Sequence, residues 1–393
     1  MVGATTSTNA PSSLFSDRVR VRDGPSAYTT PTYEVLDERV GPMWDAVRST
    51  LDAWFSRLPV TARAQLRERF ADRDLAVHLG ALWELYLHEA FTRLGFKVDV
   101  DIGRDAGDGR RPDLLVSRGP VRFYVEATAV HGADVLDPAQ RRLAAHLHDL
   151  IDRAHVQDFL VELEVDRYGT RTPGRRDVVA PLESWLGGLD AEAVSVAEKR
   201  GAPPEMLTVE FSGWRMSFTA IPLELRGDHD HRVLGAHGEG IAEIDDITPL
   251  RRKLKRKAGH YGELDAPYAI AVLCAGTFVE ARDIEGALFG SIGGAYHPET
   301  GFRWTRNRNG LWMHDSGPTY TRVSAVLSAT GLSATSVATV TPCWWSNPWA
   351  RAPIDFPGPW DHMVADDRGH TDLRPTGERP GALVGLSERW PFG

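Results

Sequence analysis

Cysteine and long apolar runs are scarce in this chain of 393 residues. Only Cys274 and Cys343 are present, too few for a disulfide framework or a cysteine-based zinc site, so we expect a protein of the reducing cytoplasm. No run approaches the roughly 18 to 20 apolar residues of a membrane helix. Residues 1–16 also lack the basic start and apolar stretch of a secretion signal. We therefore expect neither membrane insertion nor classical secretion.

Lysine is scarce as well, because 40 of the 45 basic residues are arginine. Three of the five lysines, Lys253, Lys255 and Lys257, nevertheless lie within five positions. The formal net charge of −9 argues against a protein that coats nucleic acid nonspecifically, yet it leaves room for a local basic face. Hydrophobic residues make up 42% and charged residues 25%, values of an ordinary globular protein, which exclude a wholly disordered chain.

The pattern along the chain predicts an α/β protein in four segments. Residues 1–30 are expected to be a disordered arm, 31–74 a helical preface, 75–290 an α/β core with inserted strands, and 291–393 an irregular wrapping segment rich in tryptophan and proline. Tryptophans of that last segment are expected to anchor it to the core rather than to stack on bases. Periodicity and capping signals predict helices at 33–57, 61–73, 75–94, 138–154, 182–189 and 248–262, and strands at 96–101, 113–117, 121–130, 159–166, 207–211, 215–225 and 268–274.

Two acidic residues in adjacent predicted strands form the strongest candidate site. In the strand at 121–130, alternation places Glu126 on the face opposite Phe123 and Val125, so a carboxylate interrupts an apolar strand. If Asp113 shares that face, the two carboxylates and the carbonyl of Ala127 supply hard oxygen ligands, which suit Mg²⁺ or Mn²⁺ better than zinc. The pattern therefore predicts a divalent metal site.

The helix that precedes these strands offers a third carboxylate. Helical geometry puts Glu84 at the border of the apolar stripe, whereas Glu89 falls on the far side, toward solvent. An inward glutamate costs free energy unless it is paired or binds metal. Glu84 is therefore the third site candidate.

This ordered set resembles the PD-(D/E)xK nuclease superfamily, whose restriction-endonuclease-like core is a helix that often carries a glutamate, a hairpin with Pro-Asp, and a strand with (D/E)xK. The resemblance maps the helix glutamate to Glu84, the Pro-Asp to Pro112 and Asp113, and the strand acid to Glu126. Threonine stands at Thr128, where the pattern has lysine. The resemblance covers roughly residues 78–130, with the helix and strand at 248–274 as a continuation. It implies a restriction-endonuclease-like mixed central sheet flanked by helices and a magnesium-dependent nuclease that acts on DNA rather than RNA, in restriction, defence or repair.

The predicted basic helix offers a replacement for the missing lysine. Lys257 falls within the apolar stripe that includes Leu250, Leu254 and Tyr261, so we expect its amine to point into the same cleft, within a few ångströms of Glu126. Tyr261, four residues on, would support the site. The remaining basic residues are expected to form a solvated face that binds nucleic acid: Arg251, Arg252, Lys253, Lys255 and Arg256.

Two other interpretations stay open at this point. The chain could be a binding module of the same fold that has lost hydrolysis with the lysine at position 128. It could also be a structural protein in which arginines such as Arg111 and Arg122 neutralise the carboxylates. The sequence leaves a homodimer open.

Overall fold

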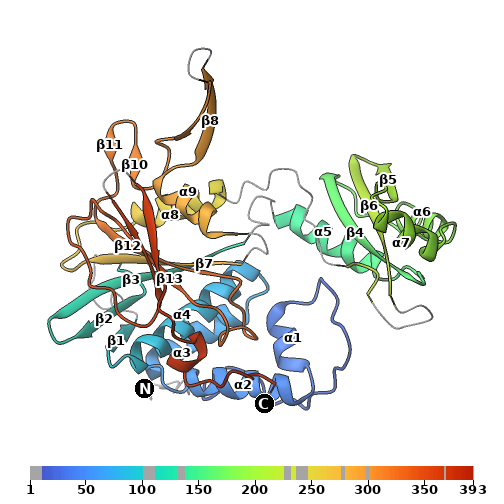
Figure 1. Cartoon of the computed structure of the whole chain (residues 1–393). Helices are drawn as coiled ribbons and strands as arrows, with labels where there is room; N and C mark the ends of the chain where they lie inside the picture. Colours follow the sequence, from blue (N-terminus) through green and yellow to red (C-terminus); the bar gives the residue numbers. More distant parts are fainter. Residues whose placement is uncertain are drawn as a thin grey trace, which may run out of the picture. The chain divides into compact units, whose positions relative to one another are not determined.

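The computed structural model describes residues 11–100, 111–131, 138–224, 232–235, 247–275, 279–297, 301–366 and 369–392. The chain divides into two compact units (Figure 1). Unit 1 comprises Met1–Asp23, Pro31–Gly132 and Asp246–Gly393, and unit 2 comprises Gly24–Thr30 and Ala133–Asp245. Within the described residues, no helix is long and apolar enough to span a membrane.

Unit 1 is built on a mixed sheet of eight strands. Its strands, in spatial order, are β1 (Lys97–Val100), β2 (Leu114–Arg118), β3 (Val121–Val130), β7 (Tyr268–Cys274), β12 (Val323–Thr330), β13 (Cys343–Ser346), β14 (Asp361–Ala365) and β15 (Thr371–Arg374). Strands β1, β2 and β3 are antiparallel neighbours, whereas β3, β7 and β12 run parallel to one another. The outer strands add an antiparallel, a parallel and an antiparallel pairing. The expected α/β class with a mixed central sheet flanked by helices is confirmed.

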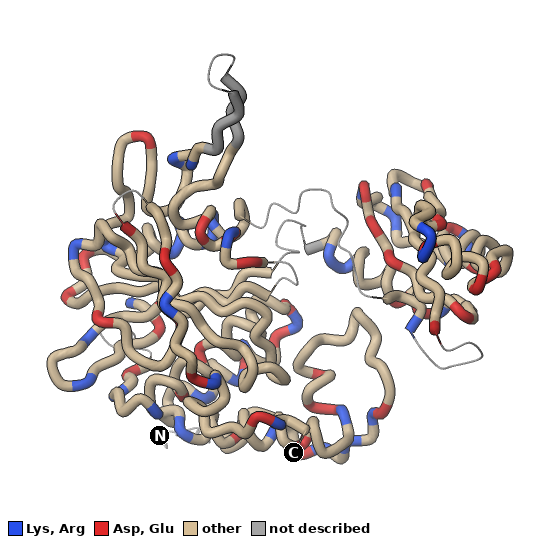
Figure 2. The backbone as a smooth tube through the Cα atoms, in the orientation of Figure 1, with Lys and Arg blue, Asp and Glu red and all other residues tan. Residues whose placement is uncertain are grey.

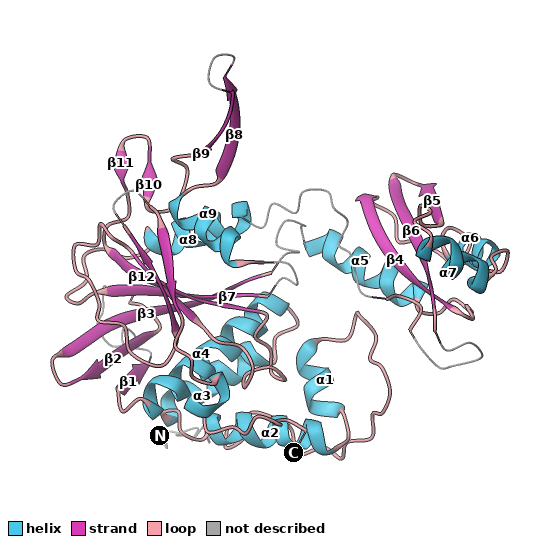
Figure 3. Ribbon diagram, in the orientation of Figure 1, coloured by secondary structure: helices cyan, strands magenta, loops and turns pink. Residues whose placement is uncertain are grey.

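Helices cover both faces of this sheet (Figure 3). One face packs against α4 (Leu75–Arg93), which is itself covered by α1 (Thr32–Glu38), α2 (Pro42–Phe55) and α3 (Val60–Phe70). The other face packs against α8 (Ile247–Ala258) and α9 (Ala281–Phe289). Because both faces are covered, β7 is buried along its whole length, as its continuous apolar sequence predicts.

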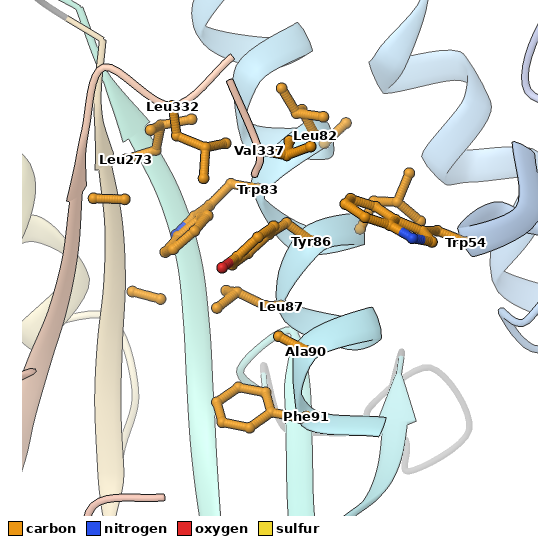
Figure 4. Close-up of a cluster of buried hydrophobic side chains, with 14 of the residues drawn as sticks. Trp54, Leu82, Trp83, Tyr86, Leu87, Ala90, Phe91, Leu273, Leu332 and Val337 are labelled. Atoms are coloured by element: carbon orange, nitrogen blue, oxygen red, sulfur yellow. The ribbon is translucent and has the colours of Figure 1, made fainter. Parts of the chain in front are cut away.

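Helix α4 is the central element of the core on its side of the sheet. Asp74 caps its start by accepting from the backbone N–H groups of Ala76 and Val77, and Gly95 follows its end with a φ of +78°, a conformation that favours glycine. Figure 4 shows Trp83 and Phe91 between the helix and the strands, with Trp54 from α2 beside the helix. The helix is therefore buried on more than one side.

The sequence analysis expected Glu89 to face solvent, and this prediction is wrong because that side of α4 is also buried. Its side chain is 1% exposed and accepts hydrogen bonds from Arg57 at 2.6 and 2.7 Å, with Arg93 as a further partner. Burial raises the pKa of Glu89, but the two guanidinium groups outweigh it, and the net pKa is lowered. The outer side of α4 is therefore an interior surface whose charge is neutralised by two arginines.

Unit 2 is a small α+β unit with its own hydrophobic core. It holds α5 (Pro138–Ile151), β4 (Phe159–Arg167), α6 (Val179–Leu186), α7 (Ala191–Lys199), β5 (Met206–Phe211) and β6 (Trp214–Pro222). The strands form a separate antiparallel sheet in the order β4-β6-β5, so the strands expected to be inserted in the 75–290 core belong to another unit. Residues 133–245 contain 21 acidic and 12 basic residues, which accounts for the whole formal charge of −9.

The N-terminal prediction is wrong for the described part of the arm. Leu14 and Phe15 are buried, and the Phe15 ring stacks on Tyr33 and meets Phe70 edge-on. Gly24–Thr30 belongs to unit 2, where Asp149 accepts hydrogen bonds from the backbone of Tyr28 and Thr29. Residues 1–10 lie outside the described residues. Two buried apolar side chains therefore anchor this polar segment, together with backbone hydrogen bonds from Leu14 to Asp52 and from Ser16 to Asp37.

The C-terminal prediction of an irregular segment is also wrong. After residue 291 come four strands of the main sheet, together with β8 (Ile292–His297), β9 (Gly301–Arg306), β10 (Met313–His314), β11 (Gly317–Pro318) and α10 (Pro380–Leu383). The expected anchoring role is confirmed for Trp344 and Trp345, which are consecutive on β13 and are buried in the cores on opposite faces of the sheet. The C-terminal segment is therefore anchored by a strand of the main sheet, β13, which carries both tryptophans and pairs with β12.

Candidate active site

Glu126 is the buried centre of the candidate site. Its side chain is 2% exposed and lies on the α8 face of β3. Lys257 of α8 donates to its Oε1 and forms an ion pair with it, and the Tyr261 hydroxyl donates to its Oε2. The expected approach of Lys257 to Glu126 is confirmed, so each oxygen of this buried carboxylate has a donor.

The apolar stripe of α8 brings Lys257 to this position. Leu250 and Leu254 are buried against the sheet, and Lys257 follows them on the same side with 23% of its side chain exposed. Its stem is therefore packed while its amine reaches Glu126. Thr128, which stands where the family pattern has lysine, is buried on β3 two residues beyond Glu126.

Arg322 fixes the turn that carries Tyr261. It donates to the carbonyls of Ala258, Tyr261 and Gly262 at 3.3, 2.8 and 3.0 Å, and so satisfies carbonyls at and beyond the end of α8. The sequence predicted a helix that continues to Gly262, but α8 ends at Ala258. Nothing local in the sequence points to Arg322, because it lies 61 residues from Tyr261.

Asp113 lies beside Glu126 at the start of β2. The antiparallel register pairs Leu114 with Val125, so Asp113 stands one position beyond that pair, next to Glu126. Its Oδ2 accepts a hydrogen bond from the backbone N–H of Ala127 at 2.8 Å. Because the N–H and C=O of a strand residue point to the same side, the Ala127 carbonyl also faces this end of β2. The two expected carboxylates and the expected carbonyl are therefore neighbours.

The site holds more negative than positive charge. Burial, and after it the negative charges of Glu126 and Glu84, raise the pKa of Asp113 to about 8 against the opposing effects of Lys257 and the Ala127 N–H. At Asp113, Lys257 and the Ala127 N–H thus do not offset burial and the two neighbouring carboxylates. A cation beside Asp113 would relieve this imbalance.

Glu84 contributes to that imbalance from α4. Its orientation toward the interior is confirmed, because the residue is 7% exposed. Arg69 of α3 forms an ion pair with it at 2.7 Å, a partner that the sequence analysis missed. The helix glutamate is therefore partly neutralised, although its charge is still felt at Asp113.

The donor set fits a hard divalent cation. Asp113, Glu126 and the Ala127 carbonyl offer oxygen ligands of the kind that Mg²⁺ and Mn²⁺ prefer. Each Glu126 oxygen accepts one hydrogen bond, and a carboxylate has about four lone-pair positions, so capacity remains. Among the described residues, no group of three or more His, Cys, Asp or Glu side chains is placed to hold a metal by itself. Such an ion would therefore need the Ala127 carbonyl or water as further ligands.

The arginines considered as neutralising partners point elsewhere. Arg111 donates to the Tyr124 hydroxyl at 2.9 Å, and Arg122 pairs with Asp265 at 3.0 Å. In the structural interpretation these two side chains would have satisfied the carboxylates. Among the described residues, Arg69 does meet a site carboxylate, that of Glu84.

Basic residues, drawn in blue in Figure 2, occupy half of α8. Their side chains differ in exposure. Arg252 and Arg256 are exposed, whereas Lys253 and Lys255 are half-buried. Arg251 donates to the Gly286 carbonyl of α9 at 3.3 Å, so it also contributes to helix packing. The exposed basic face is therefore narrower than the sequence analysis expected, with Arg252 and Arg256 at its centre.

Comparison with known proteins adds no relative. A scan of family models, a search of curated proteins and a search of solved structures each found no match to this chain. The functional argument therefore rests on the geometry of the site.

We predict that Asp113→Asn stabilises the protein in the presence of a chelator. The amide keeps an acceptor for the Ala127 N–H and removes one of the repelling charges. The free energy of unfolding at pH 8, measured by urea titration, should rise by about 1 kcal/mol or more. Glu263→Gln, an exposed position, is the matched control and should change little.

The pH dependence gives the same prediction a second readout. The folded protein keeps on Asp113 a proton that the unfolded chain releases near its ordinary pKa of 3.8. The contribution of Asp113 to stability therefore falls as pH rises from about 4 to about 8, and Asp113→Asn should flatten that decline. An equally steep decline in the variant would contradict the assigned charge balance.

Proposed function

We propose that this chain is a metal-dependent phosphodiester hydrolase that acts on DNA in preference to RNA. The observation that carries the proposal is the buried Glu126 beside Asp113, with Lys257 supplied from another element. The resemblance to the PD-(D/E)xK superfamily suggested the two acids and left the lysine unplaced. Lys257 reaches Glu126 from α8 and would take the role of the lysine that the family pattern has at position 128.

The order of elements supports the restriction-endonuclease-like part of the proposal. Helix α4 precedes the antiparallel strands β1, β2 and β3, and α8 leads into β7, which pairs in parallel with β3. Pro112 and Asp113 lead into the second strand, and Glu126 lies within the third. These are the positions at which the resemblance expects them.

Asp113, Glu126 and the Ala127 carbonyl would hold Mg²⁺ or Mn²⁺. When bound, the ion would supply Lewis-acid activation of water and charge neutralisation at the phosphate. Lys257 would donate to a phosphate oxygen as negative charge develops there, since its amine already lies at the carboxylate that borders the site. Tyr261 would hold the orientation of Glu126, and Glu84 would orient the attacking water.

The exposed arginines of α8 would form the face of the protein that binds nucleic acid. Arg252 and Arg256 lie on the same helix as Lys257, on its solvent side. Guanidinium groups bind phosphates through paired hydrogen bonds, which suits a nucleic-acid backbone. Unit 2, with its net negative charge, is less suited to nonspecific DNA contact.

One observation favours a second candidate function, a nucleic-acid binder that does not cleave. Glu126 is bound by Lys257 and Tyr261, and Glu84 is paired with Arg69, so most of the acidic charge has a partner without metal. In that case the basic face of α8 would act alone. Cleavage assays with divalent ions separate the two functions.

We predict that the purified protein nicks or linearises plasmid DNA with Mg²⁺ or Mn²⁺. Glu126→Gln should lower the rate at least about a hundredfold, since this carboxylate would hold the metal and accepts from Lys257. Glu162→Gln, an exposed glutamate of unit 2, is the matched control and should cleave normally. Gel electrophoresis with a chelator lane measures the outcome. Undiminished cleavage by Glu126→Gln would contradict the site.

Catalysis and binding should separate between Lys257 and the exposed arginines. We predict that Lys257→Ala lowers the cleavage rate with little loss of affinity for DNA. The double change Arg252→Ala and Arg256→Ala should instead weaken affinity and reduce the dependence of log K on log salt by about one unit per lost phosphate contact. Fluorescence anisotropy at several salt concentrations measures both effects. The same loss of affinity in all variants would refute distinct roles.

A further inference from the structure

A second polar cluster lies at the beginning of β3 in unit 1. The Tyr124 hydroxyl donates to Asp265 Oδ1 at 2.8 Å and accepts from Arg111 at 2.9 Å. Arg122 donates to Asp265 Oδ2 at 3.0 Å, and its guanidinium lies 5.7 Å from the centre of the Tyr124 ring. We call these four residues the Arg111–Arg122 cluster. In this cluster, two guanidinium groups and one carboxylate surround a single hydroxyl group.

The cluster lies one step along the strands from the candidate active site. Tyr124 precedes Glu126 by two residues, so both are on the α8 face of β3, about 6.6 Å apart along the strand. Arg111 likewise precedes Asp113 by two residues at the entry to β2. Adjacent phosphates of an extended nucleic-acid strand have a comparable separation. A strand with one phosphate at the acid pair would therefore place a neighbouring phosphate near the cluster.

The charges of the cluster leave it able to bind an anion. Two guanidinium groups face one carboxylate, so the cluster is net positive. Arg111 is exposed, and its hydrogen bond in the described structure uses one of five donors. Asp265 is 61% exposed, so water competes for its ion pair with Arg122, which is itself 40% exposed. An incoming phosphate can replace this carboxylate on Arg122 while Arg111 donates its remaining N–H groups.

We propose that the Arg111–Arg122 cluster binds the internal phosphodiester next to the one held at Asp113 and Glu126. This inference rests on the proposed function, because the acid pair defines the neighbouring phosphate. Tyr124 is a positioning residue that holds the Arg111 guanidinium. Asp265 occupies Arg122 in the absence of nucleic acid and competes with the phosphate.

The test uses the full chain with Lys257→Ala and Mg²⁺, because this variant keeps Asp113 and Glu126 and should bind DNA while cleaving it slowly. Short single-stranded DNA oligonucleotides, each with one uncharged methylphosphonate linkage, are compared by fluorescence anisotropy. We expect one linkage at which neutralisation weakens binding about tenfold, and we expect that loss to vanish when Arg111→Ala is added. Arg200→Ala, an exposed arginine of unit 2, is the matched control and should leave the loss intact.

Asp265 gives a test with the opposite sign. Asp265→Asn should tighten binding of the unmodified oligonucleotide, because the phosphate no longer competes with a carboxylate for Arg122. Glu263→Gln removes the same charge two residues away on the exposed loop and controls for general electrostatics. A cluster that only braces the fold predicts equal or weaker binding for Asp265→Asn.

The outcomes distinguish this inference from the proposed function. If the wild type cleaves DNA but no methylphosphonate position depends on Arg111, the phosphate site is wrong and the nuclease stands. If the wild type does not cleave but the Arg111-dependent position is found, the nuclease is wrong and the phosphate site stands. If Arg111 affects only oligonucleotides with a 5′-terminal phosphate, the assignment to an internal phosphodiester is wrong.

Discussion

The buried carboxylate of Glu126 is the constraint on which the candidate site depends. A charge with 2% exposure is costly in a sheet unless it is paired and hydrogen-bonded, and Lys257 and Tyr261 meet that requirement from the segment that covers β3. This requirement fixes α8 against the sheet at its lysine end. Arg322 then fixes the turn beyond the helix by binding its carbonyls. Glu126 thus links β3 to α8 and to the turn after it, and Arg322 links that turn to the segment that precedes β12.

The same site remains out of electrostatic balance. The pKa of Asp113 is raised because the carboxyl group is buried and because Glu126 and Glu84 add negative charge that Lys257 does not offset. The fold therefore retains a local interaction that opposes its stability, which is common where side chains serve a ligand. Glu89 on α4 shows the contrasting case, because its two arginines lower its pKa and give it a structural role.

The elements nearest the site were the most predictable from the sequence. The bounds of β3 and β7 follow from alternation and from a continuous apolar run, and the stripe through Leu250 and Leu254 places Lys257 toward the sheet. Partners that come from distant segments could not be predicted. Arg69 and Arg322 meet their partners only through packing, so no periodicity in their own segments indicates the contact.

The remaining errors have a related cause. Glu89 was placed toward solvent because one amphipathic stripe was counted, whereas α2 and α3 bury a second side of α4. The strands from Val323 onward are separated by prolines and loops, and the pairing of the first of them, β12, with β7 is set by tertiary structure. The sequence likewise did not indicate that unit 2 has a separate core. Apolar and polar residues alternate along its strands just as they would in strands of one larger sheet.

The central claim is that Asp113 and Glu126 share a divalent cation. Anomalous diffraction from crystals of the full chain equilibrated with Mn²⁺ tests it most directly. We predict an anomalous peak about 2.0 to 2.3 Å from a carboxylate oxygen of each residue, close to the Ala127 carbonyl, and absent from crystals of Glu126→Gln. The absence of a peak in the wild type, with Lys257 and Tyr261 still bound to Glu126, would contradict the account.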